Sequence, residues 1–321
     1  VCRVNSRVRF ALTGTPVENR LGELWSIFSF LMPGYLPPYK SFCSRFEKPI
    51  VQEEDQTAVR RLNQLTGPFI LRRMKSDVLK ELPPKTENVY RIELEEEQRK
   101  LYLAAVVDAR EKLQAAKPED KMAVFAVLMR LREICCDPRL IADNWEGGSA
   151  KLDACVELVS SAVEGGHRIL LFSQFTSMLE LLAKRLDAEG ISHFTLQGST
   201  PKPVRAELVR RFNGGEVSVF LISLRAGGTG LNLTAADIVI HYDPWWNVAA
   251  QNQATDRAYR IGQQNPVQVY KLIAQDTIEE KIVELQQAKQ SLADTVTGTA
   301  DGAILSMRPD ELLQLLEGSE P

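Results

Sequence analysis

The most informative absence in this 321-residue sequence is that of a nucleotide-binding loop. The chain has no G-x-x-x-x-G-K-[ST] pattern, in which backbone N–H groups and a lysine hold a triphosphate. No strand-like run ends in an Asp-Glu pair that could hold Mg²⁺, since Asp310-Glu311, the only such pair, falls in a helical pattern. These residues alone are therefore not expected to hydrolyse a nucleotide.

Long apolar runs, paired cysteines and a surplus of positive charge are also absent. No apolar run reaches ~18 residues, which argues against a membrane span. The five cysteines show no C-x-x-C spacing and no histidine at ligand spacing, so neither a metal site nor a disulfide framework is predicted. This cysteine usage fits a protein of the reducing cell interior. A formal net charge of −3 argues against a wholly basic nucleic-acid module, although a local basic groove is compatible with it.

The composition predicts a soluble globular protein of more than one domain. Hydrophobic residues make up 44% and charged residues 25% of a chain long enough to bury two cores. The N-terminal segment lacks the layout of a signal peptide and starts without Met, close to a strand-like run. We therefore expect an intracellular protein of which this chain is one part.

The first 150 residues are typical of helices with irregular connections. The patterns predict, in order, a short strand-like run at 8–12, an amphipathic helix over 21–34, mostly helical and irregular chain over 35–92, two helices within 95–140 that separate at 117–120, and a linker at 142–150.

From Lys151 the pattern changes to apolar runs that alternate with amphipathic helices. Strands are expected at 169–173, 193–196, 217–222, 237–241 and 267–273, with helices at 152–163, 175–189, 201–213 and 247–260. Continuous apolar strands between helices indicate a parallel sheet with helices on both faces. Ligands of such sheets bind at the carboxyl ends of the strands.

A phosphate site is indicated by residues 219–263. This stretch holds a Gly-rich turn, a tryptophan pair, and then Arg257 and Arg260 in a predicted helix. Residues three apart share a helix face, and two guanidiniums on one face can grip an anion with several oxygens.

Each of these features also has an ordinary structural interpretation. The GGTG sequence at 227–230 fits a simple turn, and the two arginines fit surface ion pairs. Trp245 and Trp246 fit core anchors, and the serines and threonines after strands fit helix caps. The three histidines, His167, His193 and His241, are expected to be structural.

The order of the motifs favours the functional interpretation. The chain resembles the C-terminal half of the motor of Swi/Snf-type helicase-like ATPases, a branch of helicase superfamily two. The resemblance runs from motif III to motif VI, through residues 12–34, 69–87, 131–141, 169–182, 196–213, 223–237 and 253–263.

The resemblance implies an α/β fold, with a RecA-like parallel sheet covered by helices on both faces and preceded by a mostly helical insertion region. Its implied divisions are the end of motor lobe 1 with an insertion and the inter-lobe linker over 1–92, a second insertion over 93–148, motor lobe 2 over 149–275, and a brace helix with a tail over 276–321.

The family also implies roles for particular residues. Arg257 and Arg260 correspond to arginines that complete the ATP site, and Gly228 and Gly230 to glycines that approach the nucleotide. The resemblance implies DNA contacts by Ser173, Gln174, Ser199, Thr200, Ser223, Arg225, Gly227 and Trp246, and relay of the nucleotide state by Gly14, Thr15 and Pro16.

ATP and Mg²⁺ are the implied cofactors, bound mainly by a first lobe. The implied partner is double-stranded DNA, with no membrane and no implied oligomer. Three alternatives stay open: a remodeller of a DNA-bound protein such as RNA polymerase, with DNA only as the track, a true strand-separating helicase, and a half that works purely as an interaction module.

Three positions depart from the family pattern: Tyr259 replaces a frequent His, Val248 a usual Pro, and Asn252 a common acidic residue. The Asn252 departure puts a contact there in doubt. Short segments between motifs III and IV resemble prokaryotic members, which implies a cytoplasmic or nucleoid location.

Overall fold

The chain forms two compact units, one of residues 1–78 and 286–304 and the other of residues 79–285 and 305–321. The computed structural model describes residues 6–13, 21–52, 55–71, 79, 82–117, 120–142, 144–224, 226, 230–293 and 309–317. Among the helices within these ranges, none combines the length and the apolar character that a membrane crossing requires.

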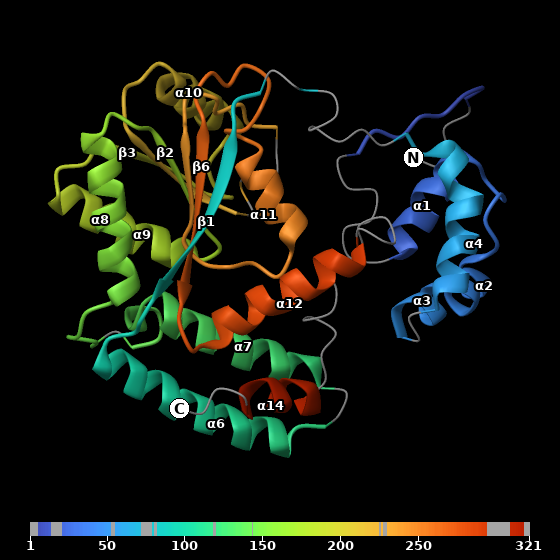
Figure 1. Cartoon of the computed structure of the whole chain (residues 1–321), viewed down its shortest axis with the longest axis horizontal. Helices are drawn as coiled ribbons and strands as arrows, with labels where there is room; N and C mark the ends of the chain where they lie inside the picture. Colours follow the sequence, from blue (N-terminus) through green and yellow to red (C-terminus); the bar gives the residue numbers. More distant parts are fainter. Residues whose placement is uncertain are drawn as a thin grey trace. The chain divides into compact units, whose positions relative to one another are not determined.

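A six-stranded, all-parallel sheet forms the centre of the second unit (Figure 1). Its order is β1-β6-β5-β2-β4-β3, and every residue of β2, β4 and β5 is buried. The strand bounds are β1 Lys85–Ile92, β2 Ile169–Ser173, β3 His193–Leu196, β4 Val219–Ser223, β5 Ile238–His241 and β6 Val267–Ala274.

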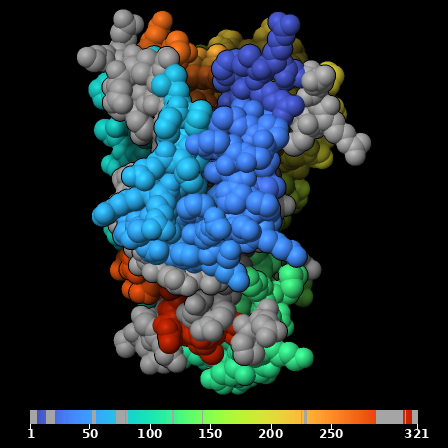
Figure 2. Space-filling view, turned by 90° about the vertical axis from the view of Figure 1, so that its right-hand side faces the viewer, coloured from blue at the N-terminus to red at the C-terminus, as the bar shows by residue number. Residues whose placement is uncertain are grey.

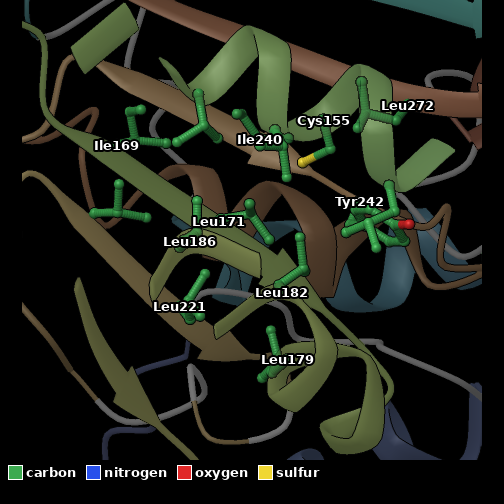
Figure 3. Packing of buried hydrophobic residues seen from close by; sticks show 14 of the residues in the cluster. Cys155, Ile169, Leu171, Leu179, Leu182, Leu186, Leu221, Ile240, Tyr242 and Leu272 are labelled. Carbon is green, nitrogen blue, oxygen red and sulfur yellow. The ribbon is translucent and has the colours of Figure 1, made fainter. Parts of the chain in front are cut away.

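Helices cover both faces of this sheet, as the sequence predicted. Helices α8 (Ala150–Glu164) and α9 (Thr176–Ala188) share a core with one face, and α10 (Lys202–Asn213) and α11 (Val248–Thr255) share a core with the other. Figure 3 shows the first of these cores, where strand side chains meet those of α8 and α9: Leu171, Leu221, Ile240, Cys155, Leu179, Leu182 and Leu186.

A helical layer lies at one end of the sheet, within the same unit (Figure 1). It contains the predicted pair α6 (Glu96–Ala115) and α7 (Lys121–Cys136), followed by the short turn η3 (Pro138–Leu140). Helix α14 (Pro309–Glu317) packs on this pair through the fully buried Leu312 and Leu316, and Arg110 donates to the Leu316 carbonyl at 3.0 Å.

The first unit is helical, and Figure 2 shows its described residues before position 72 in shades of blue. The bounds of its elements are α1 Leu21–Leu31, α2 Tyr39–Phe42, the short π-helix η1 Cys43–Glu47, α3 Lys48–Gln52, α4 Gln56–Thr66 and η2 Gly67–Phe69. The core gathers apolar side chains from these elements and from the segment between α1 and α2: Leu21, Leu24, Phe28, Leu36, Phe42, Phe46 and Leu62. Helix α12 (Ile278–Ala293) spans the division between the two units.

Three sequence predictions of local structure were wrong. Residues 85–92 form strand β1, not irregular chain, because pairing with β6 overrides a run in which only Ile92 is buried. Residues 8–12 form no strand, since the described strands all belong to the other unit. Helix α11 ends at Thr255, so Arg257 and Arg260 lie in the turns that follow.

The end of α11 coincides with a contact to another segment of the chain. The Arg257 carbonyl accepts from the N–H of Leu233 at 3.0 Å, so it is engaged by another segment. The N–H groups of Arg257 and Ala258 bond three residues back, to Ala254 and Thr255, which tightens the turn.

The fold predicts a pH dependence at His241. Burial, with a smaller contribution from Lys271, lowers the pKa of its imidazole to about 3. Below pH 6.5 this imidazole therefore takes up a proton in the unfolded chain but stays neutral in the folded chain. The free energy of unfolding consequently falls as pH falls. Between pH 7 and pH 5 we expect this histidine to cost about 2 kcal/mol of unfolding free energy.

Urea unfolding of the chain and of His241→Gln at both pH values measures this cost, since glutamine can still bond to Thr255, which lies 2.8 Å from the imidazole. The variant should lose about 2 kcal/mol less than the parent between pH 7 and pH 5. His193, which is less completely buried than His241, is replaced in the same way as the control. Equal losses in parent and variant would mean that His241 is not the group responsible.

Candidate nucleic-acid interface

The carboxyl ends of four strands bring those predicted DNA contacts that the structure describes to one edge of the sheet. Ser173 at the end of β2 is paired in register with Ser223 at the end of β4. The strand order β5-β2-β4-β3 places the segment that contains Trp246 on one side of this pair and Thr200 on the other. The sites predicted from separate segments thus follow one edge.

Ser173 and Gln174 are held there by Asp243, which follows β5. The fully buried Ser173 hydroxyl donates to Oδ1 of Asp243 at 2.6 Å and accepts from the N–H of Phe175 at 3.1 Å. The backbone N–H of Gln174 donates to the same carboxylate oxygen at 3.1 Å. The Ser173 side chain therefore has internal partners, and its DNA contact stays a prediction.

The tryptophan pair packs inward at this edge. Trp246 is 4% exposed, and its ring lies 4.4 Å from that of Trp245 and edge-on to Phe125 of α7 at 6.1 Å. Trp245 is the more exposed of the two. A DNA contact by Trp246 stays a prediction, while its packing as an anchor is an observed feature.

The remaining described contacts lie on the loops after β3 and β4. Ser199 is exposed, and Thr200 accepts from the N–H of Gln197 at 3.0 Å through its hydroxyl. The nearly buried Ser223 hydroxyl accepts from the N–H of Ala226 at 3.4 Å. Arg205 of α10 donates to the carbonyls of both loops, those of Thr200 and Ala226, each at 3.4 Å.

The two arginines meet the segment that follows the Gly-rich loop. Arg257 receives the Leu233 N–H on its carbonyl, and the exposed Arg260 donates from its guanidinium to the Leu231 carbonyl at 3.2 Å. Gly230, just before this segment, has a φ of 41°, a backbone conformation that favours glycine. The structure thus brings together two regions that the sequence assigned to one phosphate site.

The described residues fit an anion at the arginines. Arg257 is 5% exposed, and its buried Nε has no hydrogen-bond partner within the described part of the chain. Burial, and next the charge of Arg260, lowers the pKa of this guanidinium. A phosphate would supply both the missing acceptor and the opposing charge.

The described residues do not fit a metal ion in the same way. They contain no group of three or more potential metal ligands.

Six predicted site residues lie outside the described residues. They are Gly14, Thr15, Pro16, Arg225, Gly227 and Gly228.

Sequence reasoning missed two residues that organise this edge, Arg132 and Asp243. Their buried ion pair measures 3.0 Å, across 111 positions of sequence. One signal was available for Arg132, because it interrupts the buried apolar stripe of α7 that contains Leu128, Leu131 and Cys135. The sequence signal for Asp243 was weaker, because it is only a single acidic residue shortly after a buried strand.

Comparison with known proteins agrees with this geometry. Residues 1–140 match the model of the SNF2-related domain, and residues 150–262 match that of the helicase conserved C-terminal domain. The chain belongs to the Swi/Snf-type helicase-like ATPases.

Individual relatives of this Swi/Snf family member support the assignment. An uncharacterized ATP-dependent helicase of Mycoplasma genitalium is 39% identical, over 98% of this chain and 30% of the relative. The putative ATP-dependent helicase/translocase YwqA of Bacillus subtilis is 41% identical, over 95% of this chain and 34% of the relative. The chain thus spans about a third of the length of these curated relatives.

A solved structure extends the agreement to three dimensions. The Sulfolobus solfataricus SWI2/SNF2 ATPase core in complex with dsDNA is 34% identical, with a TM-score of 0.62 over 94% of this chain and 64% of that one. The RecA-like α/β fold that the sequence predicted is confirmed.

Proposed function

We propose that this chain is the C-terminal half of the motor of an ATP-driven double-stranded DNA translocase. The single observation that carries the proposal is the shared edge. Strand-end loops with predicted phosphate contacts lie along it, and Arg257 and Arg260 meet the segment after the Gly-rich loop. The Sulfolobus relative, an ATPase core solved in complex with dsDNA, supports the same assignment.

In this proposal the two arginines act in ATP hydrolysis, and the loops at the strand ends bind the DNA. Arg257 and Arg260 would bind the transferred phosphate, with a first lobe providing the triphosphate loop and the Mg²⁺ ligand. Backbone and hydroxyl contacts to DNA phosphates carry no sequence information, which suits a motor that steps along any duplex. Each ATP cycle would close and open the lobes and move one of them along a strand.

Weak DNA binding that falls with salt is the expected result for this chain alone. If the edge neutralises about three to five phosphates, the log–log slope of affinity against salt should be roughly −3 to −5. Replacement of the predicted contact Arg225 by alanine should flatten that slope by about one unit. Fluorescence anisotropy with duplexes of different sequence measures both quantities.

The control is Arg210→Ala, which removes the same charge from the exposed face of α10, where Arg210 pairs with Glu207. This variant should leave the slope unchanged. Salt-insensitive binding, or a strong preference for one base sequence, would contradict a phosphate-contacting track.

In a motor that contains both lobes, strand-displacement assays on blunt duplexes distinguish a translocase, which leaves the strands paired, from a helicase, which separates them.

A further inference from the structure

We propose that Arg132 is a positioning residue, which fixes the loops after β2 and β5 to helix α7 and so sets the shape of the nucleic-acid interface. The proposal rests on the DNA-binding function proposed for this edge. It concerns a residue that is 0% exposed and therefore acts through its neighbours.

The guanidinium of Arg132 bridges the two loops. One of its terminal nitrogens donates to Oε1 of Gln174, after β2, at 2.7 Å. The other donates to Oδ2 of Asp243 at 3.0 Å and to the carbonyl of Pro244 at 2.8 Å, both after β5. A planar group with several fixed donors can serve three acceptors at once, which a lysine ammonium of the same charge does less well.

The same guanidinium contacts the aromatic groups of the edge. Its central carbon lies 4.7 Å from the ring centre of Trp246, 5.5 Å from that of Trp245 and 5.3 Å from that of Phe175. Cations at these distances are attracted to aromatic faces, most strongly to tryptophan. Phe125, also on α7, completes the packing of Trp246.

These contacts select one arrangement of both loops. A buried ion pair is weak evidence for stability, since well-packed apolar residues often replace one at no loss, but it can specify geometry. Here the acceptors and rings belong to the segments that hold the predicted DNA contacts Gln174 and Trp246. Helix α7, whose Cys136 belongs to the core of one sheet face, thereby sets their positions.

Four variants of the whole chain test this assignment: Arg132→Met, Arg132→Lys, the pair Arg132→Met with Asp243→Asn, and Arg130→Met. The last is the matched control, because it removes an exposed positive charge from the same helix. Replacement of Trp25 and Trp145 by phenylalanine leaves emission from Trp245 and Trp246 alone, since the sequence has four tryptophans.

The first measurement is acrylamide quenching of this emission, which needs no DNA. We expect quenching to increase in Arg132→Met, to increase less in Arg132→Lys, and to stay unchanged in Arg130→Met. Unchanged quenching in Arg132→Met would overturn the proposal. If the parent chain fails to bind DNA, the proposed function fails, and quenching still decides whether Arg132 positions the loops.

The second measurement separates positioning from stability. At a temperature where circular dichroism shows every variant folded, Arg132→Met should bind duplex DNA at least about tenfold more weakly, which is the loss of one well-set contact. The double variant removes both charges and should regain melting temperature but not affinity. An affinity that returned together with the melting temperature would reduce Arg132 to a purely structural residue and overturn the proposal.

Discussion

Replacement of Arg260 by alanine is expected to abolish DNA-stimulated ATP hydrolysis in a motor that contains both lobes. Arginines that complete a phosphoryl-transfer site are worth roughly 10³–10⁵ in rate, or about 4–7 kcal/mol of barrier. The structural contribution of this exposed side chain is small, since its described hydrogen bond is a single 3.2 Å contact with the Leu231 carbonyl. Loss of it should cost under ~1 kcal/mol of stability.

Steady-state turnover, DNA affinity and melting temperature together test this expectation. In Arg260→Ala, ATP turnover should be lost while DNA affinity and melting temperature stay nearly unchanged. Arg260→Lys should restore little turnover, because lysine lacks the paired planar donors. The 321-residue chain alone should show no turnover, since its sequence contains no triphosphate loop. An active Arg260→Ala motor with a lowered melting temperature would make the arginine structural and motif VI mis-assigned.

Among the substitutions proposed for this chain, replacement of Lys151 by methionine is expected to lower the free energy of unfolding most. Lys151 of α8 and Glu279 of α12 form an ion pair with both side chains 0% exposed. The lysine also lies 5.4 Å from the ring centre of Tyr242, and the carboxylate accepts from the Ala274 N–H at 2.9 Å. Removal of one partner leaves a buried, uncompensated charge, which costs about 3–5 kcal/mol.

A double-mutant cycle by urea unfolding measures this interaction. Lys151→Met combined with Glu279→Gln should recover most of the loss, because the amide oxygen still accepts from Ala274 and no charge is left buried. Burial raises the pKa of Glu279, so in Lys151→Met this carboxylate can take up a proton and lose its uncompensated charge. Its deficit should therefore shrink as pH falls and grow as pH rises.

The neighbouring Glu280 offers the matched control. It pairs with Arg91 at 2.9 Å, but the Arg91 side chain is 55% exposed. Arg91→Met should therefore cost no more than ~1 kcal/mol. Similar losses at both pairs would argue that burial does not set the cost of breaking the pair of Lys151 and Glu279.

The parts of the fold that could be predicted are those whose signal is local. Strands β2, β4 and β5 are continuous apolar runs because both of their faces are buried, and helices α6 and α7 have regular periodicity. Strand β1 gave no such signal, because seven of its eight residues are exposed and its partner β6 lies about 180 positions away.

The candidate site divides along the same physical lines. The Gly-rich loop, the arginines and the strand-end serines are recognisable from motifs within single segments. The pairs of Arg132 with Asp243 and of Lys151 with Glu279 join residues 111 and 128 positions apart. Only the fold brings such charges together, so no spacing rule could have predicted either pair.

The position of β1 has a consequence for any attempt to isolate this lobe. The strand precedes the helical pair in sequence, yet it covers the edge of β6 along all eight residues, from Lys85 beside Val267 to Ile92 beside Ala274. A shortened protein starting after the linker, near Ser149, would expose that row of backbone donors and acceptors. Such a truncation invites strand exchange between copies and aggregation, and a version that starts before Lys85 avoids both.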